Sequence, residues 1–145
     1  MNRSEFLKKY PNRMSLEQFE RAALEEKAID WDGVYGEQCT DLSRFYFHCV
    51  LGIPQPGGVT GAQDFYYNYP RDKVLRENFE RIDNTMEFVP EPGDIAIWKG
   101  NSNNPFGHIA IVVGPSTVKA MTVLEQNYVN VLLGKEVTRQ LDTIH

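Results

Sequence analysis

The sequence predicts an α+β domain in which helices come first and pack on an antiparallel β-sheet built from the second half. Apolar residues recur at helical spacing in the first half of the chain. After about Phe88 the chain consists of short segments rich in β-branched and apolar residues. Helices followed by strands are typical of α+β proteins, because parallel sheets need alternating βαβ units. The 145 residues suit one domain spanning 1–145, with 1–14 as a leader segment.

The expected helices lie between residues 15 and 69. A first helix is expected over 15–29, where a serine cap precedes apolar residues at helical spacing. A second is expected over 40–51 and ends where glycine and proline follow. The stretch 53–61 is rich in proline and glycine and predicts a loop, and 62–69 is a short aromatic stretch that predicts a further helix.

The expected strands are 95–98, 108–113 and 121–128. Each is short and rich in apolar and β-branched residues, and clusters of glycine, proline or asparagine separate them. These three segments therefore supply the sheet.

Charge and hydropathy argue against two classes of partner, although the net charge does not exclude a local basic groove. The chain has 15 basic and 20 acidic side chains, a net charge of 15 − 20 = −5, which argues against nucleic acid as the main partner. No run of about 18 apolar residues is present, so no membrane insertion is expected. The first ten residues lack the apolar centre of a secretory signal, and we expect the chain to be synthesised in the cytoplasm.

The two cysteines are expected to be free thiols in different settings. Cys39 and Cys49 are ten residues apart, and in one helix they would be separated by ~15 Å, too far for a disulfide. Cys49 lies in an apolar stripe and is expected in the core. Cys39 lies at the expected start of the second helix, where backbone N–H groups would stabilise a thiolate. A buried, unreactive Cys39 remains the alternative.

His108 is the candidate base for a nucleophilic Cys39. His48 would point to the opposite side of the helix, ~13.5 Å further along, and His145 is the last residue. His108 heads an expected strand after a polar loop that could leave one ring edge exposed. Strand alternation puts Glu125 and Asn127 on one face, where they could orient an imidazole. A structural histidine and a solvent-facing polar pair remain the alternatives.

Three sequence blocks, in this order and spacing, resemble the CHAP domains (cysteine, histidine-dependent amidohydrolase/peptidase) of peptidoglycan hydrolases, especially phage endolysins. The blocks are Gly36-Glu37-Gln38-Cys39-Thr40-Asp41-Leu42, then Pro92-Gly93-Asp94-Ile95-Ala96-Ile97-Trp98 with Gly107-His108-Ile109-Ala110-Ile111-Val112, then Val123-Leu124-Glu125-Gln126-Asn127-Tyr128. Each block is weak alone, and together they cover roughly 15–140. Tyr128 stands where many members of the family carry tryptophan.

The resemblance implies a papain-like fold and a set of roles. Cys39 would be the nucleophile, His108 the general base and then acid, and Glu125 the orienting acid, with Asn127 in the same constellation. The backbone N–H of Cys39 would stabilise the oxyanion, with Gln38 as a second donor. The family hydrolyses amide bonds in peptidoglycan, either between N-acetylmuramic acid and L-alanine or within the peptides.

A calcium loop is expected just before Cys39. Asp30-Trp31-Asp32-Gly33-Val34 resembles the first half of such a loop, and Asp41 follows within reach. The ligands would be the carboxylates of Asp30, Asp32 and Asp41 with carbonyl oxygens of Val34 and Gly36. By composition alone the loop would be interpreted as a surface turn. Some staphylococcal-phage CHAP domains have a similar loop and bind calcium there.

The expected function is therefore a calcium-assisted cysteine peptidoglycan hydrolase, an amidase or an endopeptidase, with no organic cofactor. The alternatives are an inactive wall-binding module of the same fold and a papain-like protease acting on proteins. The chain stops about where a last strand would complete the sheet and contains no wall-binding module. We expect the catalytic portion of a longer lysin that acts on the wall after release through a holin. A complete short enzyme is the alternative.

Overall fold

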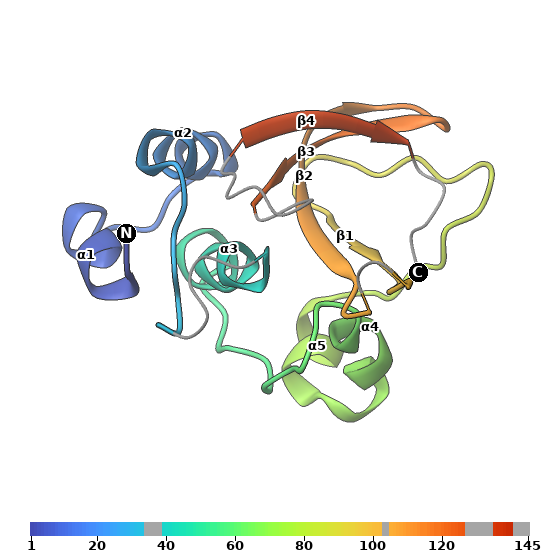
Figure 1. Cartoon of the computed structure of the whole chain (residues 1–145), viewed down its shortest axis with the longest axis horizontal. Coiled ribbons are helices and arrows are strands. Elements are labelled where there is room, and N and C mark those ends of the chain that lie inside the picture. The colour runs from blue at the N-terminus through green and yellow to red at the C-terminus, as the bar shows by residue number, and fades with distance from the viewer. Residues whose placement is uncertain (34–38, 103–104, 127–134, 141–145) are drawn as a thin grey trace.

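A computed structural model describes residues 1–33, 39–102 and 105–126 and the backbone of 135–140. Helices occupy the first part and strands the second, so the predicted α+β class is confirmed (Figure 1). The helical elements are α1 (Arg3–Lys9), α2 (Leu16–Glu26), α3 (Cys39–Tyr46), the π-helical turn η1 (Phe47–Leu51), α4 (Asp64–Asn68), the 3-10 turn η2 (Tyr69–Arg71) and α5 (Lys73–Asn78). The strands are β1 (Ile95–Trp98), β2 (His108–Ser116), β3 (Ala120–Glu125) and β4 (Lys135–Gln140).

The described strands form one antiparallel sheet in the order β1-β2-β3-β4. β1 has the predicted bounds, and β2 begins at the predicted residue but continues to Ser116. The register places Trp98 opposite His108 at one end of the β1–β2 pair. β4 was not predicted, and it pairs with β3 along its whole length. This topology brings the start of β2 next to the end of β3.

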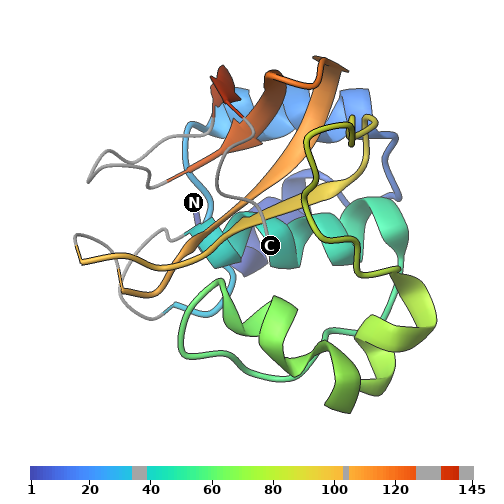
Figure 2. The ribbon, with the colours of Figure 1, turned by 90° about the vertical axis from the view of Figure 1, so that its right-hand side faces the viewer.

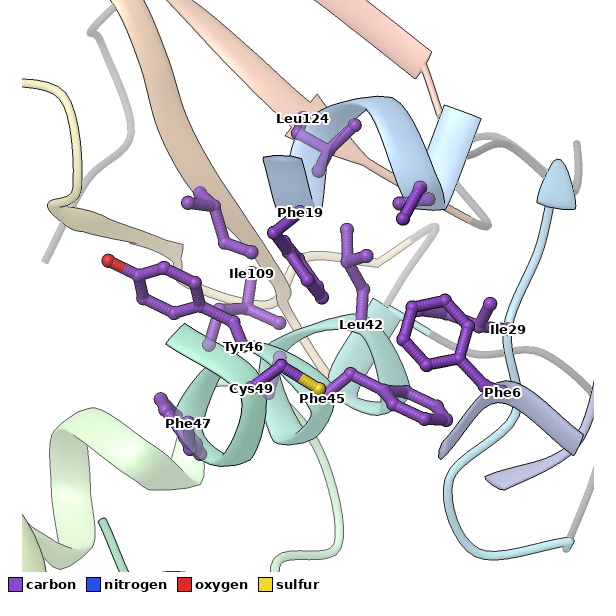
Figure 3. Close-up of a cluster of buried hydrophobic side chains, with 14 of the residues drawn as sticks. Phe6, Phe19, Ile29, Leu42, Phe45, Tyr46, Phe47, Cys49, Ile109 and Leu124 are labelled. Carbon is purple, nitrogen blue, oxygen red and sulfur yellow. The ribbon is translucent and has the colours of Figure 1, made fainter. Parts of the chain in front are cut away.

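The main core lies between the helices and one face of the sheet. α3 packs against β2 beneath the strands (Figure 2). Ile109 and Leu124 of the sheet face the aromatic side chains of the helices, and the predicted core residue Cys49 is 3% exposed (Figure 3). The opposite face of the sheet carries a second buried cluster: Ala96, Trp98, Ala110, Val112, Met121 and Val123.

The segment 1–14, expected as a leader segment, contributes to the core. Asn2 and Glu5 form a capping box that starts α1. Phe6 is fully buried, with its ring centroid 4.8 Å from that of Phe45 and 6.5 Å from that of Phe19. A helix of this length is stable because tertiary packing holds it, and one buried phenylalanine gives no periodic signal in the sequence.

The second predicted helix is present but not uniform. It begins at Cys39, changes to a π-helical turn at Phe47, and ends at Gly52, which has a φ of 64°. The short aromatic helix falls within the predicted 62–69, as α4. α5, capped by Asp72, was not predicted, because its sequence is mostly polar. Among the described helices none combines the length and apolar composition that a membrane span needs.

Candidate active site

His108 and Glu125 form a buried pair where β2 begins and β3 ends. His108 Nε2 lies 2.8 Å from Glu125 Oε1, and the two side chains are 6% and 0% exposed. The sequence predicted that these two side chains would meet, and the structure brings them together. The alternative was that Glu125 belongs to a solvent-facing polar pair. Because Glu125 is fully buried, its carboxylate does not face solvent.

The contact with Glu125 assigns a tautomer to the ring of His108. A carboxylate accepts hydrogen bonds, so the proton shared with Glu125 is carried by Nε2. The lone pair of the neutral ring is then on Nδ1, which is the nitrogen able to accept a proton. The pair thus presents a base whose tautomer is set by its partner.

His108 is more enclosed than the sequence suggested. The preceding polar loop was expected to leave a ring edge exposed, but the residue is 5% exposed. The ring of Trp98, opposite it in β1, has its centroid 5.5 Å from the ring centroid of His108. Gly107 has a φ of 78°, and a Cβ atom there would lie 2.4 Å from the carbonyl oxygen of Trp98. A tight, glycine-dependent turn therefore places His108 opposite Trp98 in the sheet. His48, by contrast, is exposed, as expected of a histidine outside the site.

Gln63, just before α4, fastens the loop that leads to His108. Its backbone N–H donates to the carbonyl of Phe106, and its side-chain amide donates to that of Pro105. Its Oε1 accepts from the N–H of Gly100, 2.9 Å away. The sequence analysis missed Gln63, because a single polar residue before a short helix has no distinguishing pattern.

Cys39 begins α3, as predicted. The backbone N–H groups of Ile109, Thr40 and Cys39 itself lower the pKa of its thiol. Because Ile109 follows His108, the thiol lies near the strand that carries the candidate base.

Burial outweighs these donors and raises the pKa of the Cys39 thiol to about 11. The nearby carboxylate of Asp41 raises it further, while the three N–H groups lower it. The expectation of a stabilised thiolate is therefore corrected: the donors are where the helix start predicts them, but the thiol is the favoured form. Burial also raises the pKa of Cys49 to about 11, and both cysteines are free.

The carboxylates of Asp30, Asp32 and Asp41 converge before and within the start of α3. One oxygen atom from each lies within 4.8 Å of the others. Asp30 Oδ1 accepts a hydrogen bond from the N–H of Gly33, whose φ of 74° makes the turn that glycine allows. Asp41 is 1% exposed and lies two residues after Cys39. Three converging carboxylates suit the oxygen coordination that Ca²⁺ prefers.

Comparison with known proteins shows which family this chain belongs to. A family model of the CHAP domain matches residues 28–127. This chain belongs to the CHAP domain family. The match includes Cys39, His108 and Glu125, together with the three converging aspartates.

Two curated relatives of this CHAP domain come from staphylococcal phages. The chain is 32% identical to Endolysin PlyTW of Staphylococcus phage Twort over 112 residues, which is 68% of the chain and 21% of that protein. It is 30% identical to Endolysin LysK of Staphylococcus phage K over 84% of the chain and 23% of that protein. The chain thus spans less than a quarter of the length of these relatives.

Solved structures share the fold of this CHAP domain. A crystal structure of Ly7917 with the hydrolysing product of MDP superposes with a TM-score of 0.60 at 16% identity, over 90% of this chain and 60% of that one. The wild-type endolysin LysIME-EF1 superposes with a TM-score of 0.53 at 17% identity, over 90% of this chain and 62% of that one. At these identities the likeness concerns the fold.

Several predicted site residues lie outside the described part of the CHAP domain. They are Val34 and Gly36 of the calcium loop, Gln38 as oxyanion donor, Asn127 beside Glu125, and the excluded His145. Their roles stay predictions.

Proposed function

We propose that this CHAP domain is a peptidoglycan hydrolase that cleaves an amide bond with Cys39 as the nucleophile. The observation that carries the proposal is the buried His108–Glu125 pair, on a strand whose next residue, Ile109, lowers the pKa of the Cys39 thiol through its backbone N–H. Nucleophile, base and orienting acid are the parts that covalent amide hydrolysis requires. The names of the two phage relatives, both endolysins, support the cell wall as the substrate.

In the proposed reaction the Cys39 sulfur attacks the amide carbonyl carbon while Nδ1 of His108 accepts the thiol proton. The imidazolium then gives this proton to the leaving nitrogen, the C–N bond breaks, and a thioester remains. Water attacks the thioester, His108 accepts the water proton, and the thiol leaves protonated. Glu125 fixes the ring and balances the imidazolium charge. The Cys39 N–H, with Gln38 as second donor, stabilises the oxyanion.

The raised pKa of Cys39 determines when the proton moves. With the thiol favoured in the free domain, transfer to His108 accompanies the attack on a bound amide. We therefore propose a thiol at rest and a thiolate formed during the reaction.

The test is hydrolysis of purified Gram-positive peptidoglycan by the domain and by four variants. We expect Cys39→Ala and His108→Ala to abolish the release of new amines and the loss of turbidity. Cys49→Ala and His48→Ala, which replace the same residue types outside the site, should retain activity. Full activity of Cys39→Ala would contradict the mechanism. If neither the parent nor any variant hydrolyses peptidoglycan, the domain is an inactive wall-binding module. Casein, tested in parallel, separates wall hydrolysis from general proteolysis.

We also propose that Asp30, Asp32 and Asp41 hold a calcium ion, with carbonyl oxygens of Val34 and Gly36 as further ligands. The convergence of the three carboxylates supports this, since like charges so close repel one another unless a cation balances them. The bound ion would offset two of the three negative charges and fix the turn. Asp41 would then connect that turn to the first turn of the Cys39 helix.

The natural setting is proposed to be a longer lysin that carries a separate wall-binding domain and reaches the wall through a holin. The short span of the chain relative to its phage relatives supports the first part. The net charge of −5 provides little attraction to an anionic wall. Sedimentation of the isolated domain with purified walls should therefore show weak binding, and strong binding would contradict the need for a second domain.

A further inference from the structure

Gln126 makes a two-point contact with the backbone of Ile29 across most of the chain length. Its Oε1 accepts a hydrogen bond from the Ile29 N–H at 3.1 Å, and its Nε2 donates to the Ile29 carbonyl at 2.7 Å. Both hydrogen bonds are buried, and Gln126 and Ile29 are each fully buried. The side-chain amide thus pairs with both polar groups of one residue, as a neighbouring strand would.

The segment that Gln126 holds is also held from its other side by the start of the chain. The N–H of Asp30 donates to the carbonyl of Met1 at 2.8 Å, and the ammonium group of Met1 donates to the carbonyl of Ala28 at 3.1 Å. Residues 28–30 are therefore hydrogen-bonded on two sides. These hydrogen bonds fix the position of the Asp30 backbone.

Gln126 and Ile29 are each adjacent in the chain to a residue of a candidate site. Gln126 directly follows Glu125, and strand alternation directs these side chains to opposite faces. Glu125 contacts His108 on one face while Gln126 contacts Ile29 on the other. Ile29 directly precedes Asp30, the first aspartate of the converging cluster. The Gln126–Ile29 contact thus directly adjoins a residue of each candidate site, Glu125 on one side and Asp30 on the other.

The third member of the cluster completes a connection to the nucleophile. Asp41 lies in the first turn of α3, two residues after Cys39. The cluster therefore adjoins Cys39 through Asp41, and adjoins Glu125 through Asp30, Ile29 and Gln126. A change in the cluster can reach both the nucleophile helix and the orienting acid.

We propose that Gln126 is a positioning residue that couples the Asp30–Asp32–Asp41 cluster to the His108–Glu125 pair. When a divalent cation binds the aspartates, it restrains Asp30 and its backbone, and Gln126 transmits this restraint to the peptide that carries Glu125. The inference rests on the proposed calcium site and catalytic roles, and it adds a route between them.

The chemistry of the contact explains why an amide is needed. Glutamine offers one acceptor and one donor, which match the N–H and the carbonyl of Ile29. Gln126→Met keeps a side chain of similar length and removes both hydrogen bonds. Gln126→Glu keeps the acceptor for the Ile29 N–H and removes the donor. The two variants therefore separate loss of the whole contact from loss of its donor.

The experiment uses nuclear magnetic resonance of the ring Nε2 proton of His108 during Ca²⁺ titration of the whole chain, with calorimetry in parallel. In the parent we expect Ca²⁺ to slow the exchange of this proton with water. In Gln126→Met we expect this response to be lost and Ca²⁺ to bind about tenfold more weakly, because two buried groups of Ile29 lose their partners. Gln126→Glu, which retains one hydrogen bond, should show an intermediate response if Gln126→Met proves too unstable to study.

Phe19→Leu is the control for lost stability, because Phe19 is a core residue that packs against Phe6 and Tyr46. It should keep the parent response of the His108 proton. A parent-like response in both Gln126 variants would overturn the proposal, as would a His108 proton that ignores saturating Ca²⁺ or a parent that binds none. The readout needs no substrate, so failure of the domain to hydrolyse peptidoglycan is a separate result.

Discussion

Glu125 contacts His108 through Nε2, the ring nitrogen farther from the backbone, at 2.8 Å. This leaves Nδ1 as the basic nitrogen, so exchanging the carboxylate for an amide should have a specific consequence. In Glu125→Gln the side chain can donate to Nε2 and thereby favour the ring tautomer protonated at Nδ1.

We therefore expect Glu125→Gln to lower kcat on peptidoglycan by a factor on the order of 10²–10⁴ with a small change in KM. A thermal unfolding curve close to that of the parent would show that the loss is chemical. An unchanged kcat would mean that the Glu125 carboxylate does not set the tautomer.

The thiol at position 39 should react with iodoacetamide in a pH-dependent way. With its pKa raised to about 11 by burial, we expect slow alkylation at pH 7 and a rise of about tenfold per pH unit towards that value. Cys49, which is 3% exposed, should stay unmodified in the folded domain. A flat rate from pH 5 to 8 would instead indicate a preformed ion pair between the thiolate and the His108 imidazolium.

The free energy of unfolding should fall as the pH rises from about 9 to about 11. In this window the unfolded chain releases its thiol protons, since the ordinary pKa is 9.0, while the folded chain retains them up to about 11. The unfolded state then binds fewer protons, so stability decreases with pH. Urea unfolding at several pH values should show a smaller decrease for Cys49→Ala than for the parent. Equal slopes would contradict the raised pKa of the buried thiol.

Removal of calcium should lower the thermal midpoint of the domain. At a Ca²⁺ concentration of about 100 times Kd the ion would contribute roughly 2.7 kcal/mol. We expect Asp30→Ala with Asp32→Ala to abolish calorimetric Ca²⁺ binding and the effect of a chelator. Glu77→Gln, which removes a carboxylate that pairs with Lys73, is the matched control. Unchanged binding in the double variant would show that the ion is held elsewhere.

Substitution of Gly107 should disturb the site without touching a reactive group. In Gly107→Ala the Cβ atom would collide with the Trp98 carbonyl, and the φ of 78° is unfavourable for alanine. We expect a loss of stability of about 1–3 kcal/mol and reduced kcat. Gly58→Ala, at a position with no neighbour within 4 Å, should resemble the parent in unfolding and activity. Parent-like unfolding of Gly107→Ala would argue against a strained turn.

Periodicity and alternation predicted the elements that carry the site. The apolar spacing after residue 40 located α3, and strand alternation placed Glu125 where it meets His108. Patterns of this kind report which face of an element is apolar. They do not report how deeply a side chain is covered, and for this reason the pKa of Cys39 was predicted in the wrong direction.

The elements and contacts that the sequence did not predict depend on single residues or on partners distant in the chain. α1 is held by Phe6, and α5 is a polar segment capped by Asp72. Gln63 and Gln126 act through backbone groups 37 or more residues away. A side-chain amide that bonds to a distant backbone follows no periodic pattern, so only the folded arrangement reveals it.

The positions of the two tryptophans give the domain two intrinsic fluorescent reporters. The Trp98 ring lies 5.5 Å from the His108 ring, so its emission should change when that imidazole becomes charged. Trp31 lies between Asp30 and Asp32 in the chain, with its ring 5.7 Å from that of His48 and close to the Arg3 guanidinium. A Trp31→Phe domain would emit from the candidate active site, and a Trp98→Phe domain from beside the aspartate cluster. The intrinsic fluorescence of these two variants would then report on the two sites separately during turnover, with no added dye.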